Sequence, residues 1–289
     1  MIEQTMTVTM RLELHTMNDY QNIILEIDGD VATITLNRPE KKNCMSPELH
    51  EEMVYALREV RAAKVKVLVL TGAGDAFIGG MDLEKCFFEP FDDPEKFAEG
   101  TEFSFEWMKH LKAFPAVSIA KVNGWCFGGG MEVVGLCDIC IAAEESTWGL
   151  SEVNFGIFPG GGTTWTVAHN MPARKQALYY ALTADTFDGK KAVELGWASK
   201  AVPLAELDEV TQQVVDTLTS KGRIVLQKTK EVYERARDMN FPDSIDYEIA
   251  KLWELSRLTR DDWIRSALDS FKKREYKPGL EGYKVDQDL

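Results

Sequence analysis

Apolar and polar residues alternate between positions 22 and 37, and after that apolar residues recur at helical spacing. Positions 22–28 and 31–37 alternate, and Gly29-Asp30 between them is typical of a tight hairpin turn. Positions 46–62 carry apolar side chains on one helical face and open with Ser-Pro-Glu, which favours a helix start. The pattern predicts a hairpin followed by a helix.

Helices and strands are then predicted in turn as far as residue 142. Nearly continuous apolar runs indicate buried strands, and apolar residues at helical spacing indicate helices between these strands. The strands are expected at 65–70, 116–122 and 137–142, and the helices at 94–113 and 131–136. This order indicates an α/β fold.

The second half of the chain has mainly helical patterns. Helices are expected at 174–182, 189–195, 204–218, 224–237 and 244–271. We therefore divide the chain into a polar N-terminal tail at 1–19, a core at 20–204 and an appended helical module at 205–289.

Composition and charge narrow the possible functions. The 289 residues are 45% hydrophobic and 28% charged, which is an ordinary globular composition. The net charge of −14 argues against a nucleic-acid partner, because neutralising phosphates needs a basic face. The apolar runs are too short for a membrane span and the N-terminus has no signal-peptide pattern, so we expect a cytoplasmic protein without a membrane partner.

Several familiar motifs are incomplete. Cys137-Asp-Ile-Cys140 has no second ligand pair at metal-binding spacing, so we expect buried, reduced thiols and no metal. Gly72-Ala-Gly74 lacks the third glycine of a dinucleotide site, and Ser151 lacks the second glycine of a nucleophile elbow. None of the four histidines has a partner by motif.

Two glutamates lie beside glycine-rich stretches. Glu132 follows Gly128-Gly-Gly130 at an expected helix start, and Glu152 precedes the glycine-rich segment 156–162. Backbone N–H groups at such turns can approach a ligand oxygen, and a nearby carboxyl can move protons on that ligand. The pair indicates an enzyme that stabilises an enolate, although each glutamate alone could equally be structural, as a first-turn helix acid for example.

Four segments in the same order resemble the crotonase (enoyl-CoA hydratase/isomerase) superfamily. They are 36–45, 79–83, 122–138 and 149–162. The resemblance implies a spiral core of ββα units with a C-terminal helical module that forms trimers or pairs of trimers. It also implies an acyl-CoA thioester as substrate, with coenzyme A as part of that substrate and no other cofactor.

Carried over by position, the resemblance assigns roles to individual residues. The backbone N–H groups of Met81 and Gly129 would form an oxyanion hole for the thioester oxygen. Glu132 and Glu152 match the two glutamates with which hydratases of the family place water and move its proton. A basic loop of Arg38, Lys41 and Lys42 would meet the phosphates of coenzyme A.

Within the superfamily, further segments resemble hydroxycinnamoyl-CoA (feruloyl-CoA) hydratase-lyases. These are 123–130, 149–156 and 277–284, together with Tyr247, which matches a tyrosine associated with the ring hydroxyl of the substrate. Two positions depart from that pattern. Glu132 is typical of simple hydratases rather than of the lyases, and Cys86 stands where a second substrate-facing tyrosine is expected.

These resemblances imply hydration of an enoyl-CoA, with a hydroxycinnamoyl-CoA such as feruloyl-CoA as the expected substrate. Retro-aldol cleavage to an aromatic aldehyde and acetyl-CoA is expected to follow. Three alternatives stay open: a short- or medium-chain enoyl-CoA hydratase, a non-catalytic acyl-CoA-binding protein of the same fold, and a nicotinamide-dependent reductase.

Overall fold

The computed structural model describes residues 20–90, 92–260, 263–275 and 277. The tail predicted at 1–19 lies outside these residues. The predicted hairpin is confirmed, because β1 (Ile23–Asp28) and β2 (Val31–Leu36) pair antiparallel around Gly29. No helix among the described residues is long and apolar enough to cross a membrane.

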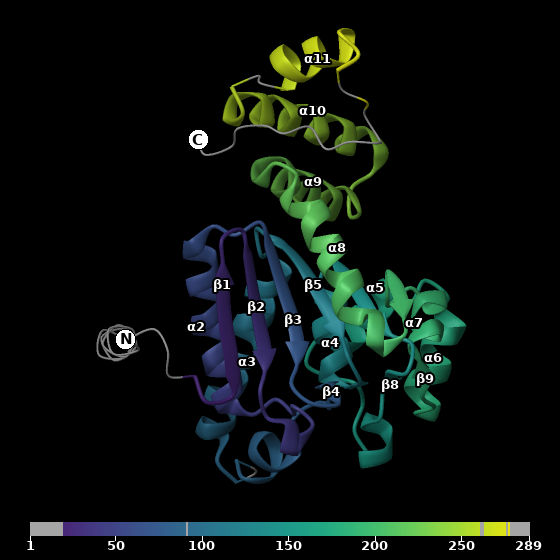
Figure 1. The fold of residues 1–289 in the computed structure, drawn as a ribbon. Coiled ribbons are helices and arrows are strands. Elements are labelled where there is room, and N and C mark those ends of the chain that lie inside the picture. Colours follow the sequence, from purple (N-terminus) through teal and green to yellow (C-terminus); the bar gives the residue numbers. More distant parts are fainter. Residues whose placement is uncertain (1–19, 91, 261–262, 276, 278–289) are drawn as a thin grey trace.

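A six-stranded sheet forms the centre of the fold (Figure 1). Its strand order is β1-β2-β3-β5-β7-β10, and every pair after the hairpin is parallel. The further strands are β3 (Val67–Gly72), β5 (Val117–Val122), β7 (Ile139–Ala143) and β10 (Lys200–Val202). Parallel strands need crossover connections, and the chain between them supplies the helices that cover the sheet.

A second, four-stranded sheet has the order β4-β6-β8-β9. Its strands are β4 (Ala76–Ile78), β6 (Trp125–Phe127), β8 (Thr147–Gly149) and β9 (Phe187–Asp188). The sequence pattern predicts none of these four strands, because segments of two or three residues show no periodicity. Each of the first three comes soon after a long strand of the first sheet, so this small sheet lies close to the carboxyl ends of β3, β5 and β7.

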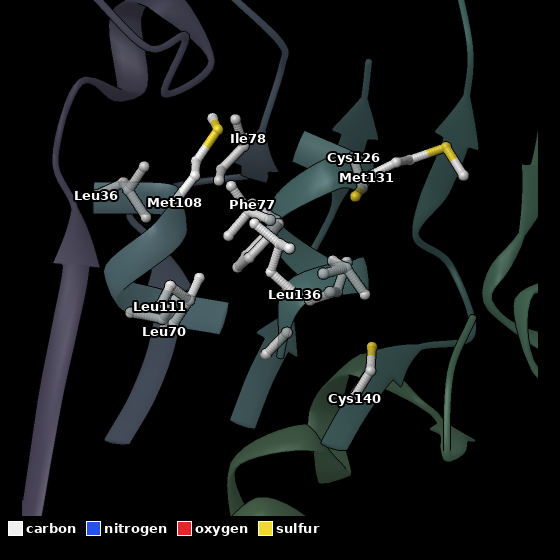
Figure 2. Packing of buried hydrophobic residues seen from close by; sticks show 14 of the residues in the cluster. Leu36, Leu70, Phe77, Ile78, Met108, Leu111, Cys126, Met131, Leu136 and Cys140 are labelled. Carbon is white, nitrogen blue, oxygen red and sulfur yellow. The ribbon is translucent and has the colours of Figure 1, made fainter. Parts of the chain in front are cut away.

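The main core lies between the first sheet and the helices α2 (Pro47–Ala63), α3 (Pro94–Lys112) and α4 (Gly129–Leu136) (Figure 2). As predicted, Ser46 caps α2 by accepting a hydrogen bond from the N–H of Leu49. α4 is short and almost wholly buried, so its one charged residue, Glu132, lies in the interior.

The helices after α4 cover the remaining surfaces of the sheets. They are α5 (Thr163–Asn170), α6 (Arg174–Thr183), α7 (Gly189–Leu195) and α8 (Leu207–Thr219). Short 3₁₀ turns occur at η1 (Pro39–Lys41), η3 (Glu152–Phe155) and η4 (Leu204–Glu206), and a π turn at η2 (Glu84–Phe88). α8 buries Leu207 and Val215 against Val67 and Ile141 on the sheet, so the first helix of the predicted module packs on the core.

The last helices stack beyond the sheet, away from α4 (Figure 1). They are α9 (Arg223–Ala236), α10 (Phe241–Leu258), η5 (Trp263–Ala267) and α11 (Leu268–Lys272). The single helix predicted at 244–271 is wrong. α10 ends at Leu258 because Arg260 adopts a left-handed backbone (φ 52°), which interrupts the helix despite continuous helical patterning.

Candidate active site

Glu132 lies in the first turn of α4, with its carboxyl against the start of α5. The residue is only 5% exposed, and the hydroxyl of Thr163 donates a hydrogen bond to its Oε2 at 3.3 Å. Gly162, which precedes α5, has φ 124°, and a Cβ there would lie 2.2 Å from Glu132 Oε1. A glycine at 162 is therefore required for this carboxyl to take its position.

Glu152 opens η3, directly after β8, and its carboxyl lies against the turn that begins α4. A Cβ at Gly128 would be 2.9 Å from Glu152 Oε1. The other oxygen, Oε2, is buried and has no hydrogen-bond partner among the described residues. The carboxyl of Glu152 thus lies against Gly128, and the same turn carries Glu132 four residues later.

Burial raises the pKa of both carboxyls. For Glu132 burial outweighs the opposing Thr163 hydrogen bond, and with the charge of Glu152 it raises the pKa to about 8. For Glu152, burial again raises the pKa, against a backbone hydrogen bond that lowers it. Since the two groups repel each other when both are ionised, the pair retains one proton near neutral pH. One carboxyl can then act as an acid while the other acts as a base.

Gly129 and Met81, predicted as the oxyanion hole, are neighbours in space. A Cβ at Gly129 would lie 2.7 Å from Met45 Cε and 3.6 Å from Met81 Sδ. Met45 and Met81 form a parallel bridge, in which the N–H of Asp82 donates to the Met45 carbonyl. In the described part of the chain, neither Gly129 nor Met81 donates its N–H to another backbone carbonyl, so both donors can serve a ligand oxygen.

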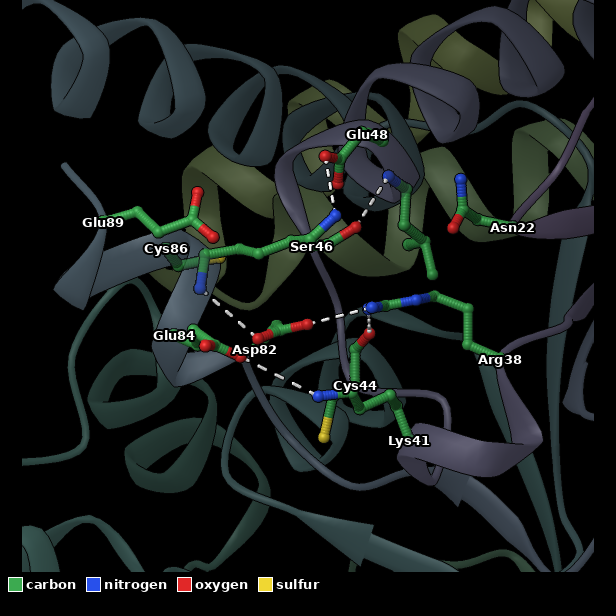
Figure 3. Close-up of polar contacts among 12 residues, drawn as sticks. Asn22, Arg38, Lys41, Cys44, Ser46, Glu48, Asp82, Glu84, Cys86 and Glu89 are labelled. Carbon is green, nitrogen blue, oxygen red and sulfur yellow. Dashed lines mark hydrogen bonds and ion pairs between the residues drawn. The ribbon is translucent and has the colours of Figure 1, made fainter.

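The loop around Met81 is held by a buried ion pair (Figure 3). Arg38 Nη2 lies 2.9 Å from Asp82 Oδ2, and Arg38 also donates to the carbonyl of Cys44. These bonds tie the segment after β2 to the residue that follows Met81. The guanidinium of Arg38 is thus already paired within the chain, and its predicted contact with coenzyme A phosphates stays a prediction.

Of the two lysines of the same loop, Lys41 is exposed and Lys42 is partly exposed. Lys42 Nζ is 2.5 Å from Asp75 Oδ2 and 5.6 Å from the ring centroid of Trp125, and Lys41 Nζ is 3.9 Å from Glu84 Oε2. Surface ion pairs of this kind contribute little to stability, so a phosphate can replace the carboxylate. Both lysines remain available for an anionic ligand.

Cys86 lies on η2 next to the same loop. Its thiol donates to the carbonyl of Met45 at 3.4 Å, and burial raises its pKa, so it is a neutral thiol. Cys86 therefore contacts Met45, whose side chain lies against Gly129 and whose backbone pairs with Met81.

Tyr247 is not near the carboxyl pair within one chain. It lies on α10, where its hydroxyl donates to Glu231 Oε1 at 3.1 Å and Lys251 Nζ lies 5.5 Å from its ring centroid. α9 lies between α10 and the sheet (Figure 1). The structure thus brings together Glu132, Glu152, Gly129 and Met81, with Cys86 close by, but not Tyr247.

One contact at this site was not predicted from the sequence, and one alternative offered by the sequence is excluded. The contact between Thr163 and Glu132 spans 31 residues, and no motif marks it. The alternative of a nicotinamide site at Gly72 fails on local structure. Asn123 donates to the carbonyls of Gly72 and Gly74, and the chain continues into β4 rather than into a phosphate-binding helix.

Comparison with known proteins agrees with this arrangement. The family model for enoyl-CoA hydratase/isomerase matches residues 26–277. The chain belongs to this family. The resemblance to crotonases and the predicted crotonase fold are therefore confirmed, and the family is one of enzymes that act on acyl-CoA thioesters.

Individual relatives of this crotonase cover nearly the whole chain. A hydroxycinnamoyl-CoA hydratase-lyase from Pseudomonas fluorescens is 40% identical over 92% of this chain and 97% of its own length. An (E)-benzylidenesuccinyl-CoA hydratase from Thauera aromatica is 29% identical over 83% of this chain and 92% of its own. The crystal structure of an enoyl-CoA hydratase from Bacillus anthracis superposes with a TM-score of 0.79 at 28% identity, over 88% of this chain and 97% of that one.

Proposed function

We propose that this protein hydrates the α,β double bond of a hydroxycinnamoyl-CoA such as feruloyl-CoA. The β-hydroxy thioester is then cleaved to an aromatic aldehyde, vanillin in the case of feruloyl-CoA, and acetyl-CoA. The observation that carries the proposal is the pair of buried Glu132 and half-buried Glu152 beside the N–H groups of Gly129 and Met81. The 40% identity to a hydroxycinnamoyl-CoA hydratase-lyase supports the choice of acyl group.

In the hydration step, a water oxygen bonds to the β-carbon of the substrate. The reactive form of the pair is the one in which Glu132 is ionised and Glu152 protonated. Glu132 then takes a proton from this water, and the electron pair of the double bond moves onto the thioester as an enolate. The N–H groups of Met81 and Gly129 stabilise the enolate oxygen, where each such donor contributes on the order of 3 kcal/mol. Glu152, protonated, then delivers its proton to the α-carbon, and the pair again holds one proton.

In the cleavage step, the same groups run a retro-aldol reaction. The β-hydroxyl gives its proton to the now ionised Glu152, and the bond between the α- and β-carbons breaks. The β-carbon leaves as the aldehyde, and the electron pair forms the enolate of acetyl-CoA on the same two N–H donors. Protonation of this enolate by Glu152 gives acetyl-CoA. Glu132 then releases the proton that it took from water and Glu152 regains one from solvent, so the pair is restored and the overall reaction consumes one water.

Recognition of the ring is assigned to Tyr247, which would hold a para hydroxyl and favour cleavage by a quinone-methide-like path. Because Tyr247 lies on α10, away from the pair in its own chain, we infer that it reaches the acyl group from another copy in a homotrimer or homohexamer. α10 also exposes Phe241 (78%) and Trp253 (65%), large apolar side chains that contact with another copy would cover. Cys86 would contact the acyl group from the chain's own η2.

The phosphates of coenzyme A are assigned to Lys41 and Lys42, with Arg38 behind them as the residue that orders the loop. These cations provide a local basic surface on a protein of net charge −14. We propose a cytoplasmic location, where acyl-CoA thioesters would be available.

A plain enoyl-CoA hydratase is the second candidate, favoured by one observation. Glu132, the residue typical of simple hydratases, is present, buried and hydrogen-bonded. If Glu132 activates water and the reaction stops at hydration, the β-hydroxy thioester would be released without cleavage.

Product analysis with two substrates tests these proposals. Purified protein is incubated with feruloyl-CoA and with crotonyl-CoA, while the conjugated absorbance is followed and products are separated. We expect loss of the feruloyl-CoA absorbance with equal amounts of aldehyde and acetyl-CoA. Hydration of crotonyl-CoA with feruloyl-CoA left intact would reject the aromatic substrate, and an accumulating β-hydroxy thioester would reject cleavage.

A further inference from the structure

The first turn of α5 holds the carboxyl of Glu132 through a residue to which the proposed steps give no role. Thr163 opens α5, and its hydroxyl donates to Glu132 Oε2 at 3.3 Å. We propose that Thr163 is a positioning residue of the reaction: its hydroxyl holds the carboxyl of Glu132 in the orientation in which it takes a proton from the attacking water. The inference rests on the role proposed above for Glu132.

Thr163 is as deeply buried as Glu132, and its backbone is held by hydrogen bonds. Thr163 is 2% exposed and Glu132 is 5% exposed. The Thr163 N–H donates to the carbonyl of Gly160 at 3.0 Å, and its own carbonyl accepts the hydroxyl of Thr166 at 2.9 Å. A β-branched side chain on a backbone held in this way has few rotamers. The hydroxyl is therefore a preorganised contact rather than a chance one.

A hydroxyl group suits a carboxyl that changes its protonation state during turnover. It donates to the ionised form and can rotate to accept a hydrogen bond from the protonated form. Among the described residues the Oε2 of Glu152 is buried without a hydrogen-bond partner, and the hydrogen bond that lowers the pKa of Glu152 comes from the backbone rather than from a hydroxyl. The Thr163 contact lowers the pKa of Glu132 against the larger, opposite effect of burial, so it increases the fraction of Glu132 in the ionised form that the hydration step requires.

The charged groups around Glu132 are few, so the contribution of Thr163 can be isolated. Glu152 is the ionisable group whose charge acts on Glu132. α4 carries no second charged side chain, and α3 packs on the core with Met108 and Leu111. α5 carries His169, which lies near its other end and stacks on Trp165. Loss of the Thr163 hydroxyl would leave burial and Glu152, which both favour the protonated form of Glu132.

Thr163→Val tests the proposal, because valine has nearly the same shape and no hydroxyl. We expect the acid limb of the pH profile of kcat/KM to move to higher pH by roughly one unit, the scale of losing one hydrogen bond to a charged group. kcat should fall about tenfold by the same reasoning, with KM little changed. Thr163→Ser should restore both the limb and the rate.

Thr164→Val is the matched control. It removes a threonine hydroxyl from the same turn of the helix, but that hydroxyl donates to the carbonyl of Pro159 rather than to Glu132 or Thr163. We expect this variant to leave the acid limb where it is in the wild type. Thr163→Ala serves as the second variant if the valine packs poorly.

A readout without turnover separates this inference from the proposed function. In protein labelled with ¹³C at the glutamate side-chain carboxyls, the Glu132 signal is assigned by its loss in Glu132→Gln and titrated in each variant. Thr163→Val should raise its midpoint. The role of Thr163 would be overturned if Thr163→Val changed neither the titration midpoint of Glu132 nor the acid limb of kcat/KM. It would also be overturned if Thr163→Ser did not restore the wild-type limb and rate. Undiminished hydration of feruloyl-CoA and crotonyl-CoA by Glu132→Gln would instead overturn the proposed function, whatever the titration shows.

Discussion

The carboxyl pair and the helices α9 and α10 hold their functional side chains in opposite ways. Glu132 is buried against a glycine and a threonine, and Glu152 against another glycine, so their positions are set by backbone that cannot easily move. Tyr247 lies on a half-exposed helix face within a network of charges that includes Glu231 and Lys251. Burial raises the pKa of the core carboxyls, whereas Lys228 and Lys251 lower the pKa of Glu231 to about 2.

This contrast separates the chemistry from the choice of substrate. The groups proposed to form and protonate the enolate come from one chain and from its buried core. The group proposed to recognise the ring lies on α10, away from the pair in its own chain, and is proposed to reach an active site through contact with another copy. Substitutions in the core should therefore affect all enoyl-CoA substrates, and substitutions on α10 should affect aromatic ones.

The largest effect is expected from Gly162→Ala. The new Cβ would lie 2.2 Å from Glu132 Oε1, at φ 124°, so the carboxyl must move. We expect turnover of every enoyl-CoA to fall at least about 100-fold, as misplacing a catalytic group by about 1 Å can do. Gly156→Ala is the control: it also has a positive φ (77°), but its Cβ would meet no atom within 4 Å. Equal rate losses in the two variants would show that backbone strain, rather than the position of Glu132, is responsible.

Tyr247→Phe should have a smaller and selective effect. Loss of one hydrogen bond to the ring hydroxyl should lower kcat/KM for feruloyl-CoA about tenfold and leave crotonyl-CoA unchanged. Tyr233→Phe, on the exposed surface of α9, provides the comparison and should change neither. An equal loss for both substrates would place Tyr247 in assembly or folding instead of ring recognition.

The smallest effect is on stability, and its sign should differ between the two regions. Glu132 has a raised pKa, so its contribution to folding is present below its usual value of 4.5 and is lost as the pH rises to about 8. Glu132→Gln should therefore gain stability over the wild type as the pH rises from 4.5 to about 8. Chemical denaturation across this pH range measures the gain.

Glu231→Gln should behave in the opposite way. The folded-state pKa of Glu231 is lowered to about 2, so its contribution is present above the ordinary value of 4.5 and is lost as the pH falls toward 2. The variant should be slightly less stable than the wild type at neutral pH, and the difference should vanish in acid. The same sign of pH dependence in both variants would contradict the contrast drawn between the two regions.

The sequence predicts what depends on neighbouring residues. The hairpin around Gly29, the cap of α2 at Ser46 and the helix start before Glu132 all follow from local patterns, and all are present. Resemblance adds the order of the crotonase segments, which the family match confirms. The break after α10 is also local, yet it was missed, because no Gly or Pro at the left-handed Arg260 marks it.

The remaining features depend on contacts between distant parts of the chain. β4, β6 and β8 are three-residue strands that exist because they pair with one another. Arg38 looked like a surface cation until its ion pair with Asp82 placed it in the interior. Thr163 and Gly162 meet Glu132 only because α5 packs on α4, and Tyr247 was separated from the pair by the stacking of α9 and α10 on the rest of the fold.

The central claim is that Glu132 and Glu152 together carry out hydration beside one oxyanion hole. Single-turnover hydration of feruloyl-CoA by Glu132→Gln and Glu152→Gln, at saturating enzyme and with folding checked by thermal melting, tests it most directly. We predict that each variant still binds the thioester but hydrates it at least about 1,000-fold more slowly, since acid–base groups of this kind contribute about 100- to 10,000-fold. Hydration within about tenfold of the wild-type rate in either variant would contradict the claim.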